Sequence, residues 1–407
     1  MEKPRPTNVE VFPVEYQGQN RICLRDPRAI NGKALFVSQE ALFIISHFDG
    51  RHNILKIQEK YLKNFGRILY KAEVEVIIRT LGDSLLLENE NYFYNKQKIL
   101  DQYRESEIKE SHHAGISYPN DPTELRNWLN GFFEEINGVH EPEKVSKVNS
   151  IKGIISPHID FKRGGKSYAH VYKELANISN EPTFLIFGTY HFTESTNPFI
   201  LTKKKYSTPL GNAEIDSNII RIIESSFDWD IYEGEIAHLT EHSIEFQVVF
   251  LQYIFSNRLK IVPILCNSFH QYIEKGVSPA TDYKITEFLK TVRSIIKNYP
   301  EVYLIAGADL AHVGKKFGDK ESVYDKTVDW IKERDLLSLS FSEKIDAENF
   351  YNAIKEEKDI RKICGLSPIY SLLSTIDARE GVLLDYNQVL EPETGSVVSF
   401  ASMAFYS

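Results

Sequence analysis

The feature that most constrains the fold is an alternation of short apolar segments with amphipathic segments from about residue 150 onward. The apolar segments have the length and composition of buried strands, and the intervals between them show helical periodicity. They cover residues 153–156, 183–188, 260–265 and 302–307. Residues 382–386 and 397–405 are expected to add two more strands. Apolar strands that alternate with helices predict an α/β fold, with a mostly parallel or mixed sheet flanked by helices.

The first hundred residues show a different pattern, which predicts a small winged-helix-like domain. The expected elements are a strand at 35–37, helices at 38–50, 55–65 and 73–81, and a hairpin at 85–94. Ser38 is the expected cap of the first helix. The stretch 95–122 is polar and rich in turn residues, as a linker is. We therefore expect two domains, at residues 1–100 and 101–407.

Composition restricts the classes of function. The chain has 407 residues, with 48 lysines and arginines against 57 aspartates and glutamates, and a formal net charge of −9. This acidic balance disfavours a general nucleic-acid-binding protein. No stretch approaches the ~18 consecutive apolar residues of a membrane-spanning helix, and the start lacks the apolar segment of a secretory signal. Three scattered cysteines cannot form a disulfide framework, so we expect a cytoplasmic protein.

Histidines follow three of the predicted strands. His158, His191 and His312 each come within a few residues of the end of an apolar segment, and Asp160 and Asp309 accompany two of them. Because the carboxyl ends of parallel strands meet at one edge of a sheet, these side chains are expected to converge there. A single histidine at such a place is more often a packed residue than a ligand. Three at equivalent positions favour a metal or catalytic site.

Cys364 is the cysteine best placed for chemistry. It precedes Gly365 and a predicted helix at 368–376, and the positive end of a helix dipole favours a thiolate. A thiolate is both a nucleophile and a soft metal ligand. From position alone, a small buried apolar residue is an equally good interpretation. Cys266 is expected to be a core residue, and Cys23 has no comparable setting.

The segment 241–245, Glu-His-Ser-Ile-Glu, opens a predicted helix that is apolar on nearly every side, with Thr240 as the expected cap. Because such a helix is buried, its charged first turn must face a polar cavity, a partner charge or solvent. Glu245 lies three residues after His242, so one face can carry an imidazole and a carboxylate together. The alternative is that the carboxylates only complement the positive end of the helix.

Two other motifs carry less weight. Residues 164–167, Gly-Gly-Lys-Ser, partly match a phosphate-binding loop, but Asp160 stands at the first glycine position of that pattern, so a nucleotide site is not expected there. His112 and His113 lie in the predicted linker, where adjacent histidines are usually solvated.

The ordered set of motifs resembles the Memo family, also called AmmeMemoRadiSam system protein B. The matching segments are His113-Ala114-Gly115, Ser117-Tyr118-Pro119, Ile155-Ser156-Pro157-His158, Gly188 with His191, Thr208-Pro209-Leu210-Gly211, 241–245, Ile261-Val262-Pro263, Asp309 with His312, Cys364-Gly365 and Pro368-Ile369. No single segment is diagnostic, but their common order from about residue 112 to the C-terminus is specific.

This resemblance implies a fold like that of the LigB-type, class III extradiol dioxygenases. It also implies an iron or copper site, with His158, His191 and Cys364 as ligands and His242, Asp309 and His312 as catalytic neighbours. The chain departs from the family pattern at 159–161, which read Ile-Asp-Phe where Ala-Gly-Tyr is usual, and at 189–190, where a proline is usual before the second histidine. These departures leave the implied ligands intact and bear on substrate preference. We expect Asp160, Glu241 and Glu245 to contact substrate.

The first hundred residues resemble a PqqD-like winged helix, a peptide-recognition module. This resemblance implies peptide or protein binding along a strand edge, with nucleic-acid binding less expected. A purely structural role for these residues is the other interpretation that stays open. The genomic name of the Memo family implies a radical-SAM protein and an AMMECR-type protein as partners.

The leading hypothesis is a redox enzyme that uses iron or copper. Asp309 would fix the tautomer of a ligand histidine, and His312 or His242 would carry protons. The second hypothesis is a non-catalytic protein that binds a metal or a peptide and acts with a radical-SAM protein. The third is cysteine-based hydrolysis by Cys364, which needs no metal.

Overall fold

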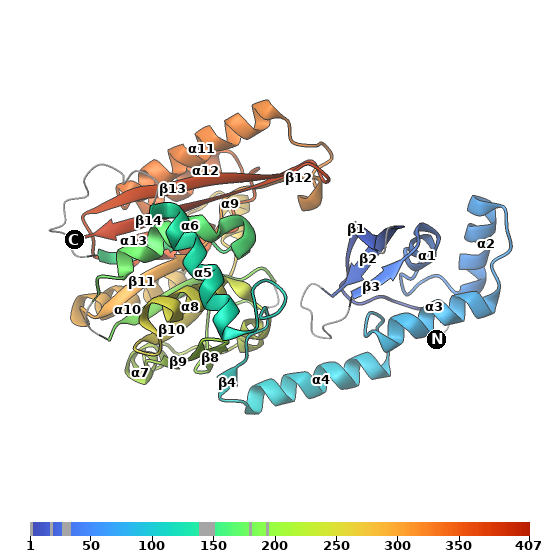
Figure 1. The fold of residues 1–407 in the computed structure, drawn as a ribbon, viewed down its shortest axis with the longest axis horizontal. Helices are drawn as coiled ribbons and strands as arrows, with labels where there is room; N and C mark the ends of the chain where they lie inside the picture. The colour runs from blue at the N-terminus through green and yellow to red at the C-terminus, as the bar shows by residue number, and fades with distance from the viewer. Residues whose placement is uncertain (1–2, 17–18, 27–33, 138–150, 179–180, 193–194) are drawn as a thin grey trace. The chain divides into compact units, whose positions relative to one another are not determined.

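In a computed structural model, the chain forms two compact units, which divide between Ser106 and Glu107. Met1–Ser106 is called the N-terminal unit here, and Glu107–Ser407 the C-terminal unit. The structure describes all residues except 1–2, 17–18, 27–33, 138–150, 179–180 and 193–194 (Figure 1). None of the described helices is both long enough and apolar enough to cross a membrane.

The N-terminal unit consists of an antiparallel sheet followed by helices (Figure 1). Its strands pair in the order β1 (Glu10–Tyr16), β2 (Gln19–Arg25) and β3 (Ala34–Val37). The helices are α1 (Gln39–Ile45), α2 (Ile54–Phe65), α3 (Lys71–Asp83) and α4 (Glu90–Glu105). Leu24 of the sheet and Ile44, Ile57, Tyr61 and Val74 of the helices are buried in one core. The unit therefore has a hydrophobic core of its own.

The predicted helices of this unit are confirmed, but the predicted hairpin at 85–94 is wrong. Ser38 caps α1 by accepting a hydrogen bond from the N–H of Ala41 at 3.2 Å. Asn89, which was placed in the hairpin turn, instead caps α4 and accepts from the N–H of Tyr92 at 2.8 Å. A short polar side chain favours a turn and a helix cap alike, so the local sequence did not separate them. The winged-helix assignment stays a prediction.

In the C-terminal unit, eleven of the described strands form one mixed sheet. At its centre lie the parallel strands β5 (Ile151–Ser156), β11 (Val302–Gly307), β6 (Thr183–Thr189) and β10 (Lys260–Cys266), in that order. The other strands are β4 (Ile108–Lys109), β7 (Phe199–Leu201), β8 (Lys205–Thr208), β9 (Gly211–Ile215), β12 (His312–Gly314), β13 (Glu380–Glu391) and β14 (Ser396–Tyr406). The four central strands are those predicted from the apolar segments, and the α/β class is confirmed.

Helices cover both faces of this sheet (Figure 1). One core contains side chains of α5 (Pro122–Asn137), α6 (Phe161–Leu175) and α8 (His242–Phe255). The opposite core contains side chains of α7 (Ser217–Glu224), α9 (His270–Lys275), α10 (Tyr283–Asn298), α11 (Asp325–Glu343), α12 (Ala347–Glu356) and α13 (Leu366–Thr375). Short 3-10 helices occur at Glu235–Leu239, Pro279–Thr281 and Lys315–Phe317.

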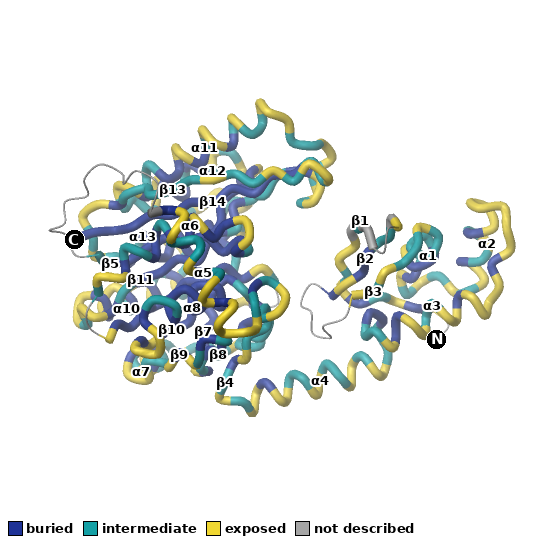
Figure 2. Tube along the Cα trace, viewed as in Figure 1, coloured by how far each residue is buried: buried dark blue, intermediate teal, exposed yellow. Residues whose placement is uncertain are grey.

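The two cores follow from the alternation of side chains along the central strands. In β6, Phe184 and Ile186 enter the core of α6 and α8, whereas Leu185 and Phe187 enter the opposite core. Successive side chains of a strand point to opposite faces, so a strand that is apolar throughout must be covered on both sides. Figure 2 shows the central strands as buried. Their faces are filled by packing, which leaves the carboxyl edge of the sheet for polar groups.

Candidate metal centre

His158 lies just beyond the end of β5, at the carboxyl edge of the sheet, and is 2 % exposed. Its Nδ1–H donates to the carbonyl of Gly307, the last residue of the neighbouring strand β11, at 3.0 Å. The backbone N–H groups of His158 and Ile159 donate to Oδ1 of Asp309 at 2.9 and 3.2 Å. The parallel pairing of β5 with β11 therefore fixes both the backbone and the ring of His158.

One carboxylate orients two further imidazoles. Glu241 is 1 % exposed and caps α8 by accepting from the N–H groups of His242 and Ser243 at 2.9 and 3.2 Å. The same carboxylate accepts from Nδ1–H of His191 at 3.1 Å, and one of its oxygens lies 3.1 Å from Nδ1 of His242. Glu241 is therefore the cap of α8 in place of the expected Thr240. It holds His191, from the loop after β6, beside His242 of α8.

His158, His191 and His242 form a cluster of three imidazoles. One ring nitrogen of each lies within 4.8 Å of the others, a spacing at which the three can hold one metal ion. The ring centroids are 4.9, 5.2 and 5.0 Å apart. In all three rings Nδ1 contacts a carbonyl or a carboxylate, which leaves Nε2 available. Histidine ligands of metals have this arrangement because the partner of the second nitrogen fixes the tautomer and the ring.

The thiol of Cys364 borders the same cluster. Its Sγ lies 3.3 Å from Nε2 of His158 and 3.8 Å from the carbonyl oxygen of Asp309. Gly365 follows and opens α13, and a Cβ at this position would lie 2.3 Å from that same carbonyl oxygen. The absence of a side chain at Gly365 thus lets the loop of Cys364 approach the loop of Asp309. An imidazole and a thiol from distant parts of the chain meet there.

Asp309 lies on the loop after β11, and His312 is the first residue of β12. Oδ2 of Asp309 is 3.6 Å from Nε2 of His158. Nδ1 of His312 contacts the carbonyl of Leu310 at 3.1 Å, and its ring packs edge-on against Phe317 at 5.0 Å. Burial lowers the pKa of His312 to about 4, although the charge of Asp309 opposes this effect. His312 is therefore a neutral imidazole near neutral pH.

Burial governs the protonation of the cluster. It lowers the pKa of His158 well below its usual value, and the neighbouring imidazoles lower it further. Burial, with the charge of Asp309, raises the pKa of the Cys364 thiol well above its usual value. For His191, burial alone lowers the pKa, but the charge and hydrogen bond of Glu241 together outweigh burial and raise it. A metal that took up this thiol would have to displace its proton.

Comparison with known proteins gives the family. The sequence profile of the Memo-like proteins matches residues 109–404, which include every residue of the cluster. The chain belongs to the Memo family. Both the family and the LigB-type α/β fold predicted from the motifs are thereby confirmed.

Relatives within the Memo family differ in length. A MEMO1 family protein of Aquifex aeolicus is 28 % identical over 401 residues, which cover 98 % of this chain and 99 % of that protein. One of Desulfurococcus amylolyticus is 28 % identical over 300 residues, or 72 % of this chain and 97 % of that protein. One of Sulfurisphaera tokodaii is 32 % identical over 237 residues, or 57 % of this chain and 73 % of that protein. The match to the Aquifex protein thus extends over the N-terminal as well as the C-terminal part of this Memo chain.

Glu245, which was expected to contact substrate in this Memo protein, already has several partners. It is fully buried and accepts from the phenol of Tyr118 at 2.6 Å and from the N–H groups of His112 and His113, each at 2.9 Å. It also forms a buried ion pair with Lys109. Burial alone would raise the pKa of Glu245, but the charges of Lys109 and His113 and the hydrogen bonds from Lys109 and Tyr118 together outweigh burial and lower this pKa to about 2. This carboxylate anchors the segment 109–118 to α8.

Asp160, like Glu245, already has partners within the protein. It caps α6 by accepting from the N–H of Arg163 at 3.2 Å, and it pairs with Nε of Arg163 at 2.5 Å. Arg163 in turn pairs with Glu391 at 2.6 Å. Contact of substrate with Asp160, Glu241 or Glu245 stays a prediction.

Sequence reasoning missed the position of His113. The residue was placed in a solvated linker, but its ring lies 5.6 Å from that of His242 and 5.5 Å from that of Phe246. Burial lowers its pKa to about 4. The motif His113-Ala114-Gly115 was the available signal, since it belongs to the Memo pattern. No comparable signal marked Lys109, a single lysine in a polar stretch.

Proposed function

We propose that this Memo-family protein is a redox protein that binds iron or copper through His158, His191 and Cys364. The proposal is carried by one observation, the set of three imidazoles tethered at Nδ1 next to the partly buried thiol of Cys364. The residues present fit such a metal, because imidazole with thiolate favours copper or ferrous iron over magnesium or calcium. Two imidazoles and one thiolate leave further coordination positions for substrate.

When bound, the metal would supply electron transfer or dioxygen chemistry. The residues of the chain orient the histidine rings and provide a group that transfers protons. Glu241 keeps His191 and His242 in one tautomer, and Asp309 holds the backbone of His158. His242 is the group placed to carry a proton, because its Nε2 is available and its ring lies against both His158 and His191. His312 is the second candidate for carrying a proton.

The test is elemental analysis of the full chain purified without added metal. We expect about one iron or copper per chain, as three convergent ligands would hold, and loss of this metal in both His158→Ala and Cys364→Ala. His170→Ala is the matched control, because His170 lies in α6 of the same unit but outside the cluster. Unchanged metal in the two ligand variants would refute this site.

The redox part of the proposal has its own measurement. Metal-loaded protein should consume dioxygen in the presence of a catechol or thiol substrate, and Cys364→Ala should not. If the loaded protein consumes none and alters no such substrate, the protein binds metal without catalysis. That result would be consistent with the proposed metal site but would exclude the proposed redox activity.

The non-catalytic alternative is favoured by the presence of an N-terminal unit with its own core, over which the match to the Aquifex relative extends. Such a unit is suited to binding a partner, for which we propose a radical-SAM protein, an AMMECR-type protein or a peptide. Co-purification with these candidates, compared between the full chain and residues 107–407, tests this role. Partner binding that does not change when residues 1–106 are removed would exclude the N-terminal unit as the docking site.

Cysteine-based hydrolysis is the least supported alternative. Its nucleophile is a thiolate, whereas burial and the charge of Asp309 raise the pKa of Cys364. A neutral thiol beside a neutral His158 is a poor nucleophile, whereas a bound metal would displace the proton and stabilise the thiolate. Full activity after chelation of all metal would reverse this ranking.

A further inference from the structure

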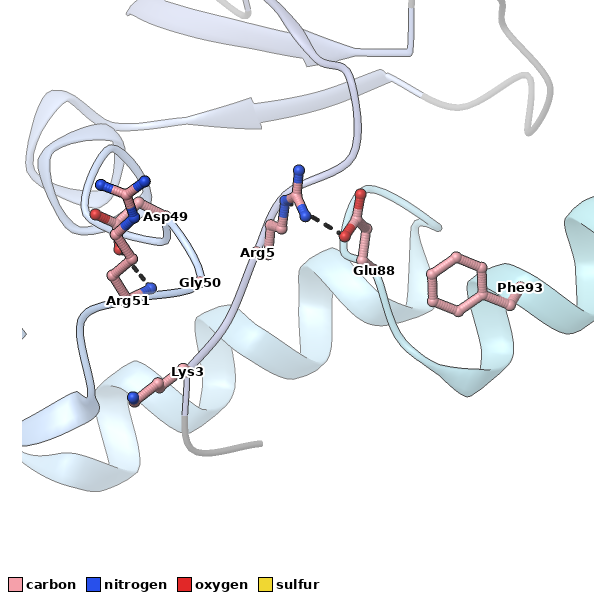
Figure 3. A pocket seen from close by; sticks show the side chains of 7 residues that line it. All are labelled: Lys3, Arg5, Asp49, Gly50, Arg51, Glu88 and Phe93. Atoms are coloured by element: carbon pink, nitrogen blue, oxygen red, sulfur yellow. Dashed lines mark hydrogen bonds and ion pairs between the residues drawn. The ribbon is translucent and has the colours of Figure 1, made fainter.

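A pocket of about 610 Å³ lies wholly within the N-terminal unit, far along the chain from the residues of the metal centre (Figure 3). Three of its lining residues are cations, Lys3, Arg5 and Arg51, and two are carboxylates, Asp49 and Glu88. The chain as a whole carries a formal charge of −9. The excess of cations in this pocket is therefore opposite in sign to the net charge of the protein.

Backbone hydrogen bonds fix the walls of this pocket. The N–H of Gly50 donates to the carbonyl of Pro4 at 2.9 Å, and the N–H of Glu88 donates to the carbonyl of Arg5 at 2.9 Å. Gly50 has a φ of +73°, which a residue without a side chain adopts at no steric cost. Three segments distant in sequence are thus joined at their backbones, so the roots of the cationic side chains are held in place.

Both carboxylates of the pocket already have partners. Asp49 accepts from the N–H groups of Arg51 and His52 at 2.8 and 2.9 Å and from Nδ1 of His52 at 2.9 Å. Glu88 lies 3.4 Å from Nε of Arg5 (Figure 3). Among the residues that the structure describes, no carboxylate pairs with the side chain of Lys3 or Arg51. Two cations of the pocket are therefore left for an outside anion.

An aromatic ring completes the pocket. Phe93, in the first turn of α4, is 56 % exposed, and Figure 3 shows Glu88 between it and Arg5. An exposed phenylalanine at the edge of a cationic pocket offers a flat apolar surface to a ring of the ligand. Arginine favours phosphate in particular, because its planar donors match two phosphate oxygens.

We propose that this pocket binds an organic phosphate of about mononucleotide size. Lys3 and Arg51 contact the phosphate group, and Phe93 contacts a planar ring attached to it. The site is independent of the metal centre and does not rest on the proposed function.

The test is calorimetric titration of the full chain, tagged only at its C-terminus, with AMP, inorganic phosphate and adenosine. We expect AMP to bind more tightly than either part alone, and its affinity to fall as salt rises. Arg51→Gln and Lys3→Gln should each weaken AMP binding about tenfold, the cost of losing a hydrogen bond to a charged group. Phe93→Leu should weaken AMP but not phosphate.

Arg79→Gln is the control for charge, because Arg79 is an exposed residue of α3 that does not line the pocket. His158→Ala is the control for phosphate bound at the metal centre. Both should bind AMP as the parent chain does. The proposal is overturned if AMP does not bind at millimolar concentration, if Arg79→Gln weakens it as much as Arg51→Gln does, or if His158→Ala abolishes it. Equal affinity for AMP and phosphate would overturn the ring contact.

Discussion

The side chain of Glu241 does two things at once: it caps α8, and it orients His191 and His242 through their Nδ1 atoms. The local cause is simple. A helix N-terminus has unsatisfied N–H groups and a positive dipole, so a carboxylate there is held tightly even when it is buried. That fixed negative charge then becomes the acceptor for two imidazoles.

We predict that Glu241→Gln lowers metal affinity by about 10- to 100-fold, the usual cost of removing a partner of a ligating histidine. The amide keeps the shape of the side chain but loses the charge that holds both rings. Competition with a chelator of known affinity measures the change.

Asp216→Asn is the matched control for this experiment. Asp216 caps α7 by accepting from the N–H groups of Asn218 and Ile219, both at 3.1 Å, and does not touch the imidazole cluster. We expect it to cost a comparable amount of stability and to leave metal affinity unchanged. Equal losses of affinity in the two variants would show that Glu241 acts only through the helix.

Glu245 makes the stability of the protein sensitive to acid. Burial alone would raise the pKa of Glu245, but the surrounding charges and hydrogen bonds, the charge of Lys109 foremost among them, together lower it from 4.5 to about 2. Its contribution is complete above pH 4.5 and is lost as the pH falls toward 2, since the unfolded chain takes up the proton first. Urea midpoints measured across this range should fall with pH. In the double variant Lys109→Met/Glu245→Gln this part of the slope should vanish, and an unchanged slope would assign it to other carboxylates.

The loop between α12 and α13 places Cys364. Lys358, Asp359 and Lys362 of this loop have φ values of 54, 48 and 54°, in the left-handed region that side chains rarely adopt. Arg361, fully buried within the loop, forms an ion pair with Asp335 of α11. The carbonyl of Arg361 accepts from the N–H of His312 at 2.7 Å. Arg361 thus ties the strained loop of Cys364 to α11 through its side chain and to the start of β12 through its backbone carbonyl.

Arg361→Met should lower the free energy of unfolding by about 3–5 kcal/mol, because it leaves Asp335 buried without its cation. Arg334→Met is the comparison. Arg334 pairs with Glu357 at 3.1 Å, and Arg361 pairs with the same carboxylate. The side chain of Arg334, however, is 28 % exposed. We therefore expect Arg334→Met to lower the free energy of unfolding by about 1 kcal/mol or less. Urea unfolding of both variants gives the difference. Similar losses would mean that burial does not set the strength of this ion pair.

Predictability from sequence differed from element to element. The central strands and α8 have runs of apolar residues, so their burial could be predicted from the local sequence. The hairpin at 85–94 was wrong because Asn89 suits a turn and a helix cap equally, and only the packing of α4 decides between them. Strands β13 and β14 are longer than the predicted 382–386 and 397–405, because their ends are stabilised by pairing with each other rather than by an apolar pattern.

At the scale of the whole molecule, the chain consists of two units with separate cores. Each buries its own apolar side chains, so each has the means to fold alone. We predict that residues 107–407 fold cooperatively and bind the same amount of metal per chain as the full protein. Thermal melting and elemental analysis test this prediction.

A chain that begins at residue 112 is the informative comparison. It lacks β4, which pairs with β8, and Lys109, the buried cation of Glu245. We expect it to be far less stable, because Glu245 then lies buried with its main charge partner missing. If the shorter chain melts at the same temperature, the segment 109–118 does not support the fold. If residues 107–407 fail to fold, the two units are not independent.

The sequence by itself determined the α/β class, the central strands and the family, and it indicated that histidines would gather at the carboxyl edge of the sheet. Each of these depends on a local pattern or on the rule that parallel strands end on one side. Only the tertiary structure decided which nitrogen of each imidazole is held, that Glu241 holds two of them, and that Lys109 and His113 belong to the surroundings of the site. Those contacts join residues far apart in the chain, and a contact of that kind leaves no periodicity or spacing in the sequence.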